Sequence, residues 1–457
     1  APPGAGKSTL LPLILLNQEW LYGKKIIMLE PRRLAARSVA MRMAELIGEP
    51  VGKSIGYRVR FETKVSEETK LEVVTEGILT RMLQSDNELS DVGLVIFDEF
   101  HERSIHADLA LALCRESQQI LRPELRLIVM SATLDMPTLE GLLKCPVIKS
   151  QGRQYPVEIK YSGEADMYMI PELAAKVIKQ AASENDGDIL AFFPGQGEIR
   201  KCEEILGRTL PQFRIHPLYG ALPFGKQKSA ILPDRDGFRK VVLATSIAET
   251  SLTIENIKVV VDSGFGRTSK FDPKSGLSRL ETVQIDQDSA DQRAGRAGRL
   301  EEGVCYRMMT KASFTKLQEH RTPEIAEADL TSLTLTLADW GINNPSQLSW
   351  LTPPPKGSIL KAKQTLIELN AISNGQITEH GREIGKLPCH PRIAHMLLEG
   401  LDMEAAALAT DLAAVLEERD PLPREAGIDI NLRIEALRRF RKEGKGGRRL
   451  ERIEKVA

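Results

Sequence analysis

Short, continuous apolar runs of strand length recur along the chain, and each is followed by small, glycine or charged residues and then by a helical stretch. In the first part of the chain these runs cover residues 24–29, 71–74, 94–97 and 126–130. Continuous apolar runs, as opposed to an alternation of apolar and polar residues, are typical of strands that are buried on both faces of a parallel sheet. The pattern therefore predicts an α/β fold in which functional residues gather at the carboxyl ends of the strands.

A second series of the same kind follows a break at residues 152–156, where glycine and proline indicate a linker. Its apolar runs cover residues 188–193, 239–244 and 259–261. Two alternating series of strands and helices predict two tandem parallel-sheet lobes, over residues 1–151 and 152–322.

Beyond residue 322 the pattern becomes mainly helical. The expected elements are helices over residues 330–340 and 359–369, a small hairpin within residues 371–384 and an alanine-rich helical stretch over residues 388–417. The hairpin is indicated by the turn pairs Asn374-Gly375 and His380-Gly381. Arginine and lysine crowd the tail of the chain, for which a solvated helix is a simpler interpretation than contact with RNA.

The first nine residues, APPGAGKST, have the pattern of a phosphate-binding loop that runs into an apolar helix. Glycine lets the backbone wrap around an anion so that successive N–H groups point inward. Lys7 is then expected to reach the β- and γ-phosphates of a nucleotide, and Ser8 to offer its hydroxyl to Mg²⁺. Ala1 stands where the general pattern has its first glycine, so a glycine-rich loop that only caps a helix is the alternative for this motif alone.

An acidic pair, Asp98 and Glu99, ends one of the buried strands. Downstream of a phosphate loop, Asp98 is expected to hold Mg²⁺ through water, and Glu99 to polarise the attacking water. A zinc site at His101, Glu102 and His106 is the alternative, but this sequence is one residue longer than the HExxH spacing that places two imidazoles on one helix face. His101 is therefore interpreted as a polar relay between the nucleotide and the rest of the molecule.

Arginines recur every three residues near the end of the second lobe, at Arg293, Arg296 and Arg299. On a helix they would share one broad face. Such a cationic face predicts contact with a triphosphate bound on the other lobe, where arginines stabilise the charge that develops in phosphoryl transfer. Gln292 is a candidate for positioning the lytic water, and a solvated arginine face is the alternative.

Small and basic residues follow two further strands of the first lobe. Arg32 and Arg33 begin a helix after the first strand, and Thr75 follows the second, so a phosphodiester backbone could lie along this edge of the sheet. A solvated basic helix start is the alternative. The Ser-Ala-Thr sequence at residues 131–133 could hydrogen-bond the acidic pair, although a helix N-cap explains it equally well.

Bulk composition narrows the class of protein without identifying it. The chain has 457 residues and a net charge of −1, so contact with nucleic acid must come from local basic stripes or from a groove and not from a global basic field. Five widely spaced cysteines without a CxxC pair are typical of reduced thiols in a cytoplasmic protein. No apolar run has the length of a membrane span. The chain opens on the loop without the strand that should precede it, so we expect an upstream part.

The ordered set of motifs resembles a superfamily 2 helicase of the DEAH-box group. The set comprises the phosphate loop, Pro-Arg-Arg, Thr-Glu-Gly, Asp-Glu-x-His, Ser-Ala-Thr, the Ala-Thr-Ser-Ile-Ala-Glu-Thr-Ser sequence from Ala244 and the Gln-Arg-x-Gly-Arg-x-Gly-Arg sequence from Gln292. Phe100 in the acidic motif, with the sequences around Gly195 and Tyr219, is most similar to the bacterial HrpB-type helicases. The resemblance covers nearly the whole chain.

This resemblance implies two RecA-like lobes with ATP and Mg²⁺ in the cleft between them, a winged-helix domain over residues 323–388 and the start of a helical bundle over residues 389–457. It implies nucleotide binding by Gly4, Gly6, Lys7, Ser8, Thr9, Asp98 and His101, with Ser8 and Asp98 on the metal. It implies catalytic roles for Glu99, Gln292, Arg296 and Arg299. It also implies RNA-backbone contacts by Arg32, Arg33, Thr75, Gly195 and Thr245.

The activity that the resemblance implies is ATP-driven translocation along single-stranded RNA in the 3′ to 5′ sense, with unwinding, in the cytoplasm and without membrane contact. A protein activator is a further partner that it allows. Two alternatives stay open at the level of sequence. One is a nucleic-acid-stimulated ATPase that remodels RNA–protein complexes, or acts on DNA, without processive unwinding. The other is a binding module that has lost hydrolysis.

Overall fold

A computed structural model describes residues 6–131, 136–150, 155–234, 236–249, 254–272, 277–299, 301–418, 420–444 and 447–457. The chain divides into two compact units. Unit 1 contains residues 1–328 with 348–353, and unit 2 contains residues 329–347 with 354–457.

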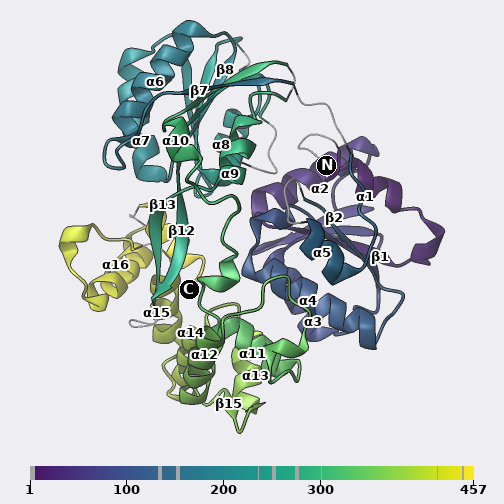
Figure 1. The fold of residues 1–457 in the computed structure, drawn as a ribbon. Coiled ribbons are helices and arrows are strands. Elements are labelled where there is room, and N and C mark those ends of the chain that lie inside the picture. Colours follow the sequence, from purple (N-terminus) through teal and green to yellow (C-terminus); the bar gives the residue numbers. More distant parts are fainter. Residues whose placement is uncertain are drawn as a thin grey trace. The chain divides into compact units, whose positions relative to one another are not determined.

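The first lobe of unit 1 is built on a six-stranded sheet in the order β3-β2-β4-β1-β5-β6 (Figure 1). Its strands are β1 (Lys25–Glu30), β2 (Ile55–Val59), β3 (Glu62–Lys64), β4 (Leu71–Thr75), β5 (Val92–Phe97) and β6 (Arg126–Val129). Every neighbouring pair is parallel except β2 and β3. The four strands expected from the apolar runs are confirmed, and β1 lies at the centre of the order between β4 and β5.

Helices cover this sheet because their apolar residues fall on one face. The helices are α1 (Leu10–Leu15), α2 (Arg33–Leu46), α3 (Glu76–Ser85), α4 (Ile105–Ile120) and α5 (Met136–Leu143). In α2, Ala36, Ala40 and Met43 are fully buried at helical spacing, and they share a core with Ile26 and Met28 of β1. Small alanines let the helix approach the sheet closely, which holds the β1 strand end in place.

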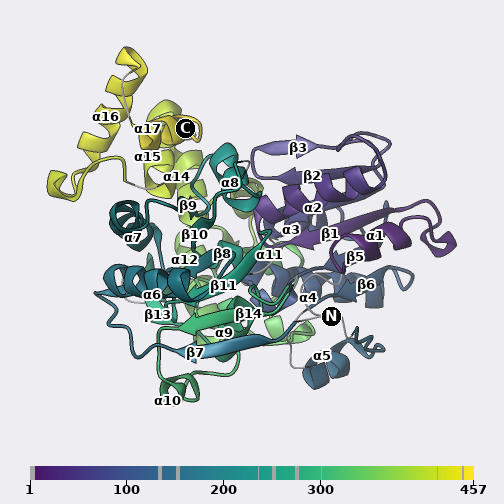
Figure 2. The ribbon, with the colours of Figure 1, turned by 90° about the horizontal axis from the view of Figure 1, so that it is seen from above.

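The second lobe repeats the design with the order β7-β14-β11-β8-β10-β9, and all of its neighbouring strands are parallel (Figure 2). The strands are β7 (Val157–Tyr161), β8 (Asp188–Phe192), β9 (Arg214–Leu218), β10 (Lys240–Ala244), β11 (Ile257–Asp262) and β14 (Gly303–Arg307). The helices are α6 (Ile170–Glu184), α7 (Gln196–Thr209), α8 (Phe224–Ile231), α9 (Gln287–Ala294) and α10 (Lys311–Phe314). Two parallel-sheet lobes are thus confirmed.

Alternate residues of β8 show how the second sheet separates its two helical layers. Ile189 and Ala191 belong to the core that contains the apolar faces of α6 and α7. Leu190 and Phe192 belong to the core on the opposite face, which contains Ala294 at the end of α9. Since successive side chains of a strand point to opposite faces, both faces of β8 are buried, as the continuous apolar run predicted.

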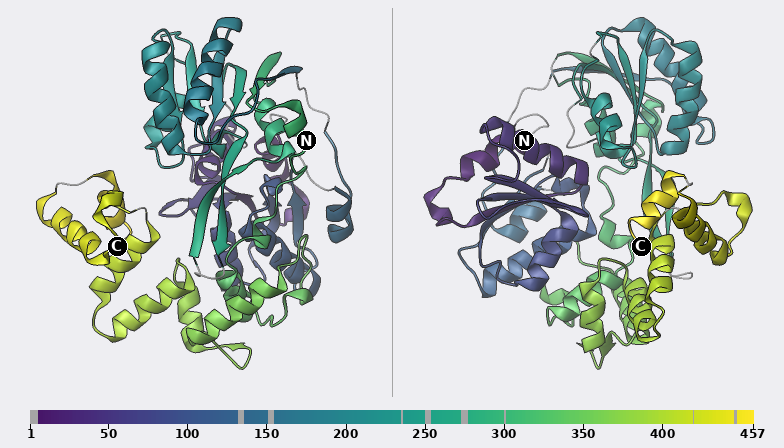
Figure 3. Two further views of the ribbon diagram at one scale, coloured as in Figure 1. Left: turned by 60° about the vertical axis from the view of Figure 1, so that its left-hand side comes forward. Right: turned by 180° about the vertical axis from the view of Figure 1, so that it is seen from behind.

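A long antiparallel hairpin, β12 (Phe265–Asp272) with β13 (Leu277–Gln284), extends from the second lobe as a separate two-stranded sheet (Figures 1 and 3). This hairpin was not predicted, because its residues are largely polar and charged and form no apolar run. Short 3₁₀ helices join the larger elements within the described ranges, at Glu19–Leu21, Phe100–Glu102, Ser246–Ala248, Glu324–Ala326, Pro345–Gln347 and Arg424–Ala426.

The described residues of unit 2 form helices and one small hairpin. Its elements are α11 (Thr331–Asp339), α12 (Lys356–Glu368), β15 (Ile372–Ser373), β16 (Gln376–Ile377), α13 (Glu379–Lys386), α14 (Pro391–Asp402), α15 (Ala406–Glu417), α16 (Ile430–Glu443) and α17 (Arg448–Glu454). The turn at Asn374 and Gly375 is confirmed, and both residues have the positive φ that a two-residue hairpin turn requires.

The second turn expected within residues 371–384 is wrong, because His380 and Gly381 lie in α13. The Thr378 hydroxyl accepts a hydrogen bond from the Gly381 backbone N–H at 2.9 Å and so caps a helix where a turn was expected. The alanine-rich stretch is helical, as expected, and contains the two helices α14 and α15. The winged-helix and bundle boundaries stay predictions. Among the described residues, every helix is too short or too polar to cross a lipid bilayer.

Candidate active site

The acidic pair lies at the carboxyl end of β5, between β1 and the edge strand β6 of the first sheet. Asp98 and Glu99 directly follow the strand, and their side chains are 0% and 8% exposed. Glu99 adopts a left-handed backbone conformation with φ 49°, so the chain turns sharply after the strand. Asp98 Oδ1 accepts a hydrogen bond from the Glu99 backbone N–H at 2.8 Å. Two carboxylates are therefore held at one buried strand end.

Lys7 and Ser8 reach the same point from the other end of the sequence. Lys7 Nζ lies 3.3 Å from Glu99 Oε1 and 3.8 Å from Asp98 Oδ1, and the lysine side chain is 9% exposed. Burial raises the pKa of Asp98, and a hydrogen bond from Ser8 opposes this rise. Gly6 precedes them, and its carbonyl accepts from the backbone N–H of Thr9 at 3.2 Å and of Leu10 at 2.8 Å. Gly4 lies outside the described residues.

The two carboxylates have opposite pKa shifts. Burial, followed by the charge of Glu99, raises the pKa of Asp98 above its ordinary value, although Lys7 and Ser8 oppose the rise. Burial also acts to raise the pKa of Glu99, but the charges of Lys7, His101 and Arg296 outweigh it and leave this pKa below its usual range. Glu99 is therefore ionised, as a group that accepts a proton from water must be.

Glu30 is a third carboxylate at this edge, and it was not assigned from the sequence. It is the last residue of β1 and fully buried, and the pairing of Leu29 with Phe97 places it beside Asp98. Burial, then the charges of Asp98 and Glu99, raise its pKa well above the ordinary value. Its surroundings therefore favour the neutral form of the carboxyl group over the ionised form. The sequence feature that could have indicated this residue is an acid that ends an apolar run just before Pro-Arg-Arg.

His101 connects the acidic pair to the strand end of β6. Its Nε2 lies 3.4 Å from Glu99 Oε2, and its Nδ1 lies 3.5 Å from the Ser131 hydroxyl. This arrangement agrees with the relay interpretation, while residues 132 and 133 of the same motif lie outside the described residues. His106 belongs to α4, whereas His101 belongs to the preceding 3₁₀ helix, so the two imidazoles do not share a helix face. The zinc interpretation gains no support.

The arginine run does not form one cationic face, and this expectation was wrong. Helix α9 ends at Ala294, before Arg296 and Arg299. Arg293 turns into the second lobe, where its side chain is 1% exposed and forms ion pairs with Glu249 at 3.0 Å and Asp262 at 2.8 Å. Burial alone would lower the pKa of Arg293, but these two carboxylates raise it. Arg293 is therefore a buried structural ion pair and not a phosphate ligand.

Arg296 and Arg299 are placed differently, because burial lowers the pKa of both and the charge of Glu99 opposes this shift in each. Burial, then the charge of Arg299, nevertheless leaves the pKa of Arg296 well below its ordinary value. Burial lowers the pKa of Arg299 to about 10. Arg296 also donates a hydrogen bond to the Glu249 carbonyl. Two guanidiniums that are destabilised by burial and by each other would gain from a bound anion.

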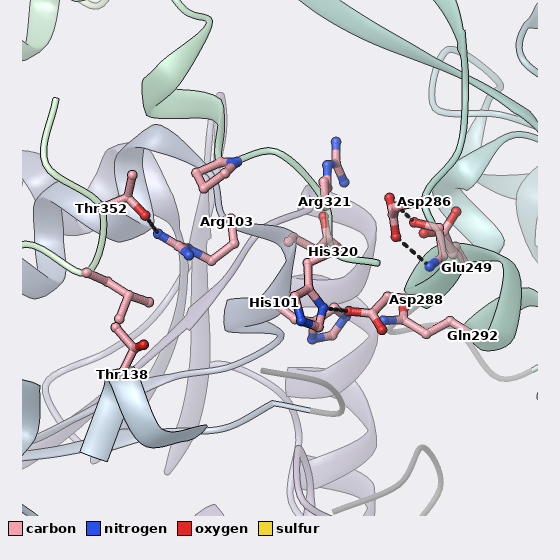
Figure 4. A pocket seen from close by; sticks show the side chains of 14 residues that line it. His101, Arg103, Thr138, Glu249, Asp286, Asp288, Gln292, His320, Arg321 and Thr352 are labelled. Carbon is pink, nitrogen blue, oxygen red and sulfur yellow. Dashed lines mark hydrogen bonds and ion pairs between the residues drawn. The ribbon is translucent and has the colours of Figure 1, made fainter. Parts of the chain in front are cut away.

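Gln292 and His101 line the same cavity within unit 1, from opposite lobes (Figure 4). The cavity has a volume of about 230 Å³. His320 and Asp288 also line it and are joined by a hydrogen bond of 2.8 Å between Nδ1 and Oδ2. Lys7 and Ser8 are not among its lining residues.

The residues proposed to contact an RNA backbone follow strands, as expected. Thr75 ends β4 and precedes α3, and Thr245 directly follows β10. Gly195 precedes α7, and a Cβ added there would lie 2.5 Å from the Arg267 guanidinium carbon. Arg267 of the hairpin β12–β13 therefore lies close to Gly195, and this arginine was not assigned from the sequence.

Arg32 and Arg33 begin α2, and their surroundings differ. The Arg32 guanidinium donates to Glu102 Oε2 at 3.1 Å and 3.3 Å and to the carbonyl of Ser246 in the second lobe. Burial acts to lower its pKa, but Glu102 and Glu249 raise it overall. Arg33 is exposed. Arg32 thus contacts both lobes within unit 1, which a backbone-binding role alone did not predict.

The same residues can be compared with known protein families. Residues 1–142 match the family described as DEAD/DEAH box helicase, and residues 171–301 match the family described as Helicase conserved C-terminal domain. The chain belongs to the DEAD/DEAH box helicases. The resemblance expected from the motifs is therefore confirmed.

Individual helicases extend this result. The chain is 47% identical over 434 residues to ATP-dependent RNA helicase HrpB of Escherichia coli, a match that covers 94% of this chain and 53% of that protein. It is 38% identical to the pre-mRNA-splicing factor ATP-dependent RNA helicase prp22 of Schizosaccharomyces pombe, over 90% of this chain and 36% of that protein. The crystal structure of E. coli DEAH/RHA helicase HrpB superposes with a TM-score of 0.90 at 44% identity, over 100% of this chain and 57% of the other. The chain spans about half the length, or less, of these relatives.

Proposed function

We propose that this helicase chain hydrolyses ATP with Mg²⁺ and couples the hydrolysis to 3′ to 5′ movement along single-stranded RNA, with unwinding. The observation that carries the proposal is the meeting of four groups around one point. Lys7, Asp98 and Glu99 come from the first lobe, and the guanidinium of Arg296 comes from the second, with each carboxylate pKa responding to a neighbouring charge.

The residues present fit a magnesium triphosphate. Ser8 and Asp98 would hold the ion, which would supply charge neutralisation for the phosphate oxygens. Lys7 Nζ forms ion pairs with Glu99 and Asp98, and a triphosphate would give it further oxygen acceptors. Among the described residues, none makes a hydrogen bond to the buried Asp98 Oδ2, so this atom retains capacity for a ligand. A triphosphate would also satisfy the excess of positive charge that Arg296 and Arg299 create.

Each side chain has one task in this proposal. Glu99 is ionised and accepts a proton from the attacking water, while Lys7 and His101 keep its pKa low. Arg296 and Arg299 stabilise the negative charge that develops on the transferred phosphoryl group. Gln292 orients the water from the second lobe, and Gly6 and Thr9 contribute to the loop around the phosphates.

RNA is the proposed track because the relatives at 47% and 38% identity are named ATP-dependent RNA helicases. Arg33, Thr75, Gly195 and Thr245 offer backbone and side-chain donors at strand ends, where contacts to phosphate and sugar are independent of sequence. Arg32 supports coupling, because it contacts Glu102 beside the acidic motif and Ser246 in the second lobe. A change in either lobe would alter these contacts.

The test combines turnover and strand displacement. ATP hydrolysis is measured with and without single-stranded RNA, and displacement is measured on RNA and DNA duplexes that carry either a 3′ or a 5′ overhang. We expect RNA to stimulate turnover and displacement to require the 3′ overhang of RNA. The variant Glu99→Gln should bind ATP and RNA but neither hydrolyse nor unwind, which makes it the matched control.

Turnover without displacement would favour the alternative, a nucleic-acid-stimulated ATPase that remodels complexes. Stimulation by DNA to the same extent would remove the preference for RNA. Absence of turnover in the wild-type chain, together with normal ATP binding, would leave only a nucleotide-binding module.

A further inference from the structure

Three metal-ligating side chains meet in unit 2, whereas the residues proposed to bind nucleotide belong to unit 1. His380 is the second residue of α13, and His395 and Glu399 lie one turn apart on α14. Their ligand atoms all lie within 4.8 Å of one another, and in the part of the chain that the structure describes no other group of three such side chains meets this condition. The cluster was not assigned from the sequence, where His380 was taken for a turn residue.

The distances within the cluster suit a single ion. Nε2 of His380 lies 2.8 Å from Nδ1 of His395, and Nδ1 of His395 lies 3.8 Å from Glu399 Oε1. Two nitrogens that bind one zinc at about 2.0–2.1 Å are about 2.9–3.4 Å apart for angles between square and tetrahedral. The imidazoles therefore need to separate by only a few tenths of an ångström. The Glu399 side chain is 53% exposed and can rotate to complete the set.

Both helices hold their ligands on a fixed backbone. At the start of α13, Gly381 lies so close to Ala371 that an added Cβ would be 2.1 Å from the Ala371 carbonyl oxygen. On α14, the neighbour of His395, Ala394, is fully buried, and Gly400 packs against Ala409, where an added Cβ would lie 2.5 Å from the alanine Cβ. Sites built on well-packed helices are more precise than sites on loops.

We propose that His380, His395 and Glu399 bind a divalent transition-metal ion, with Zn²⁺ as the first candidate. Two imidazoles and one carboxylate are donors that suit Zn²⁺, Ni²⁺ or Cu²⁺ and not Mg²⁺ or Ca²⁺. Residues four apart on a helix share a face, so His395 and Glu399 form one arm of the site and His380 forms the other. Three protein ligands leave a position for water.

Binding would replace the direct contact between the two imidazoles. Each ring would stay neutral, with its hydrogen on the nitrogen that does not face the ion, so no redox step or co-reactant is needed. The ion would join α13 to α14 and stabilise the folded state of unit 2 in proportion to its affinity and concentration. A hydrogen-bonded histidine pair without a metal is the competing interpretation.

The experiment uses the whole chain, purified without a polyhistidine tag and treated with chelator. Calorimetric titration with ZnCl₂ should give one ion per chain, and Zn²⁺ should raise the thermal unfolding midpoint. Titration with Co²⁺ should give the visible absorption of nitrogen and oxygen ligation without a thiolate charge-transfer band, which excludes the free cysteines.

His380→Gln and His395→Gln should each weaken binding at least about tenfold. Glu399→Gln should weaken it by less, because two imidazoles remain. Asp402→Asn is the matched control, since this exposed carboxylate lies on α14 outside the cluster. It should leave affinity and the zinc-dependent midpoint unchanged, and circular dichroism establishes that each variant is folded.

The proposal is overturned if the wild-type chain takes up no stoichiometric Zn²⁺, or if both histidine variants bind it as the wild type does. Equal loss of binding in Asp402→Asn and in the cluster variants would also overturn it, because the effect would then be one of general surface charge.

Discussion

In the first lobe the candidate acidic side chains directly follow a strand, β5. In the second lobe the candidate arginines, Arg296 and Arg299, follow the end of a helix, α9. Asp98 and Glu99 are fixed by β5, and Lys7 meets them there, as the motif spacing predicts. Arg293, Arg296 and Arg299 are equally spaced in sequence, but only Arg293 lies within α9, and it forms a buried ion pair. Arg296 and Arg299 follow the end of the helix and lie near Glu99. Partner and burial, and not spacing, decide what each arginine does.

The largest expected effect is on turnover. Replacement of Arg296 by Ala should lower the ATP hydrolysis rate about 10³-fold, because arginine groups that stabilise the transferred phosphoryl group contribute on this scale. Nucleotide binding should weaken much less, since the charge develops mainly in the transition state. Steady-state kinetics with an ATP-binding titration measures both. A hydrolysis rate within threefold of the wild type would contradict a catalytic role for Arg296 and so its distinction from the structural Arg293.

The next largest effect is expected on the free energy of unfolding when Arg293 is replaced. Arg293→Met should lower the free energy of unfolding by about 3–5 kcal/mol, because it leaves Glu249 and Asp262 buried without their partner. Urea denaturation followed by circular dichroism gives the difference. Arg299→Ala is the control, for which we expect slower turnover but nearly unchanged stability. Equal stability losses in both variants would contradict the separate roles.

A smaller effect concerns pH. Burial, helped by the charges of Glu102, Glu324 and Asp108 and opposed by a hydrogen bond with Ser104, raises the pKa of Glu76 from 4.5 to about 8. A raised folded-state pKa means that its contribution to stability is complete below pH 4.5 and is lost as pH rises to about 8.

Glu76→Gln should therefore become more stable relative to the wild type as pH rises through this window, by a few kcal/mol at most, on the order of 1.4 kcal/mol for each pKa unit. Thermal unfolding of both proteins near each end of the window measures the difference. A parallel pH dependence would show that the Glu76 carboxyl ionises normally in the folded chain.

The smallest effect is expected at the third carboxylate of the first lobe. Burial and the charges of Asp98 and Glu99 raise the pKa of Glu30 and so favour its neutral form, which Glu30→Gln reproduces with a similar shape. Turnover should change by less than about fivefold, whereas Glu99→Gln should lose about 10²–10⁴-fold. A large loss in Glu30→Gln would mean that an ionised Glu30 takes part in the reaction.

Much of the fold was predictable from continuous apolar runs, because a strand buried on both faces leaves that pattern whatever its neighbours are. The order of the strands was not predictable. The position of Glu30 depends on this order, because the register of β1 against β5 places its carboxyl group beside Asp98. The hairpin β12–β13 was missed because polar strands that leave the core carry no such pattern.

At the candidate site, Lys7, Asp98 and Glu99 were predictable because strand ends of a parallel sheet meet at one edge. Arg293 was not, because its partners Glu249 and Asp262 come from distant parts of the sequence. The glycines of the arginine run were a signal that the helix would stop early, and greater weight on them would have separated Arg293 from Arg296.

The account depends most on guanidiniums of the second lobe completing a site on the first. A crystal structure of the chain with Mg²⁺, ADP and aluminium fluoride, which mimics the transferred phosphoryl group, tests this directly. We expect Arg296 and Arg299 to donate hydrogen bonds to the fluoride ligands, with Lys7 beside them and Arg293 still paired with Asp262. A structure in which Arg296 and Arg299 stay out of contact with the fluoride, or in which Arg293 takes their place, would contradict the account.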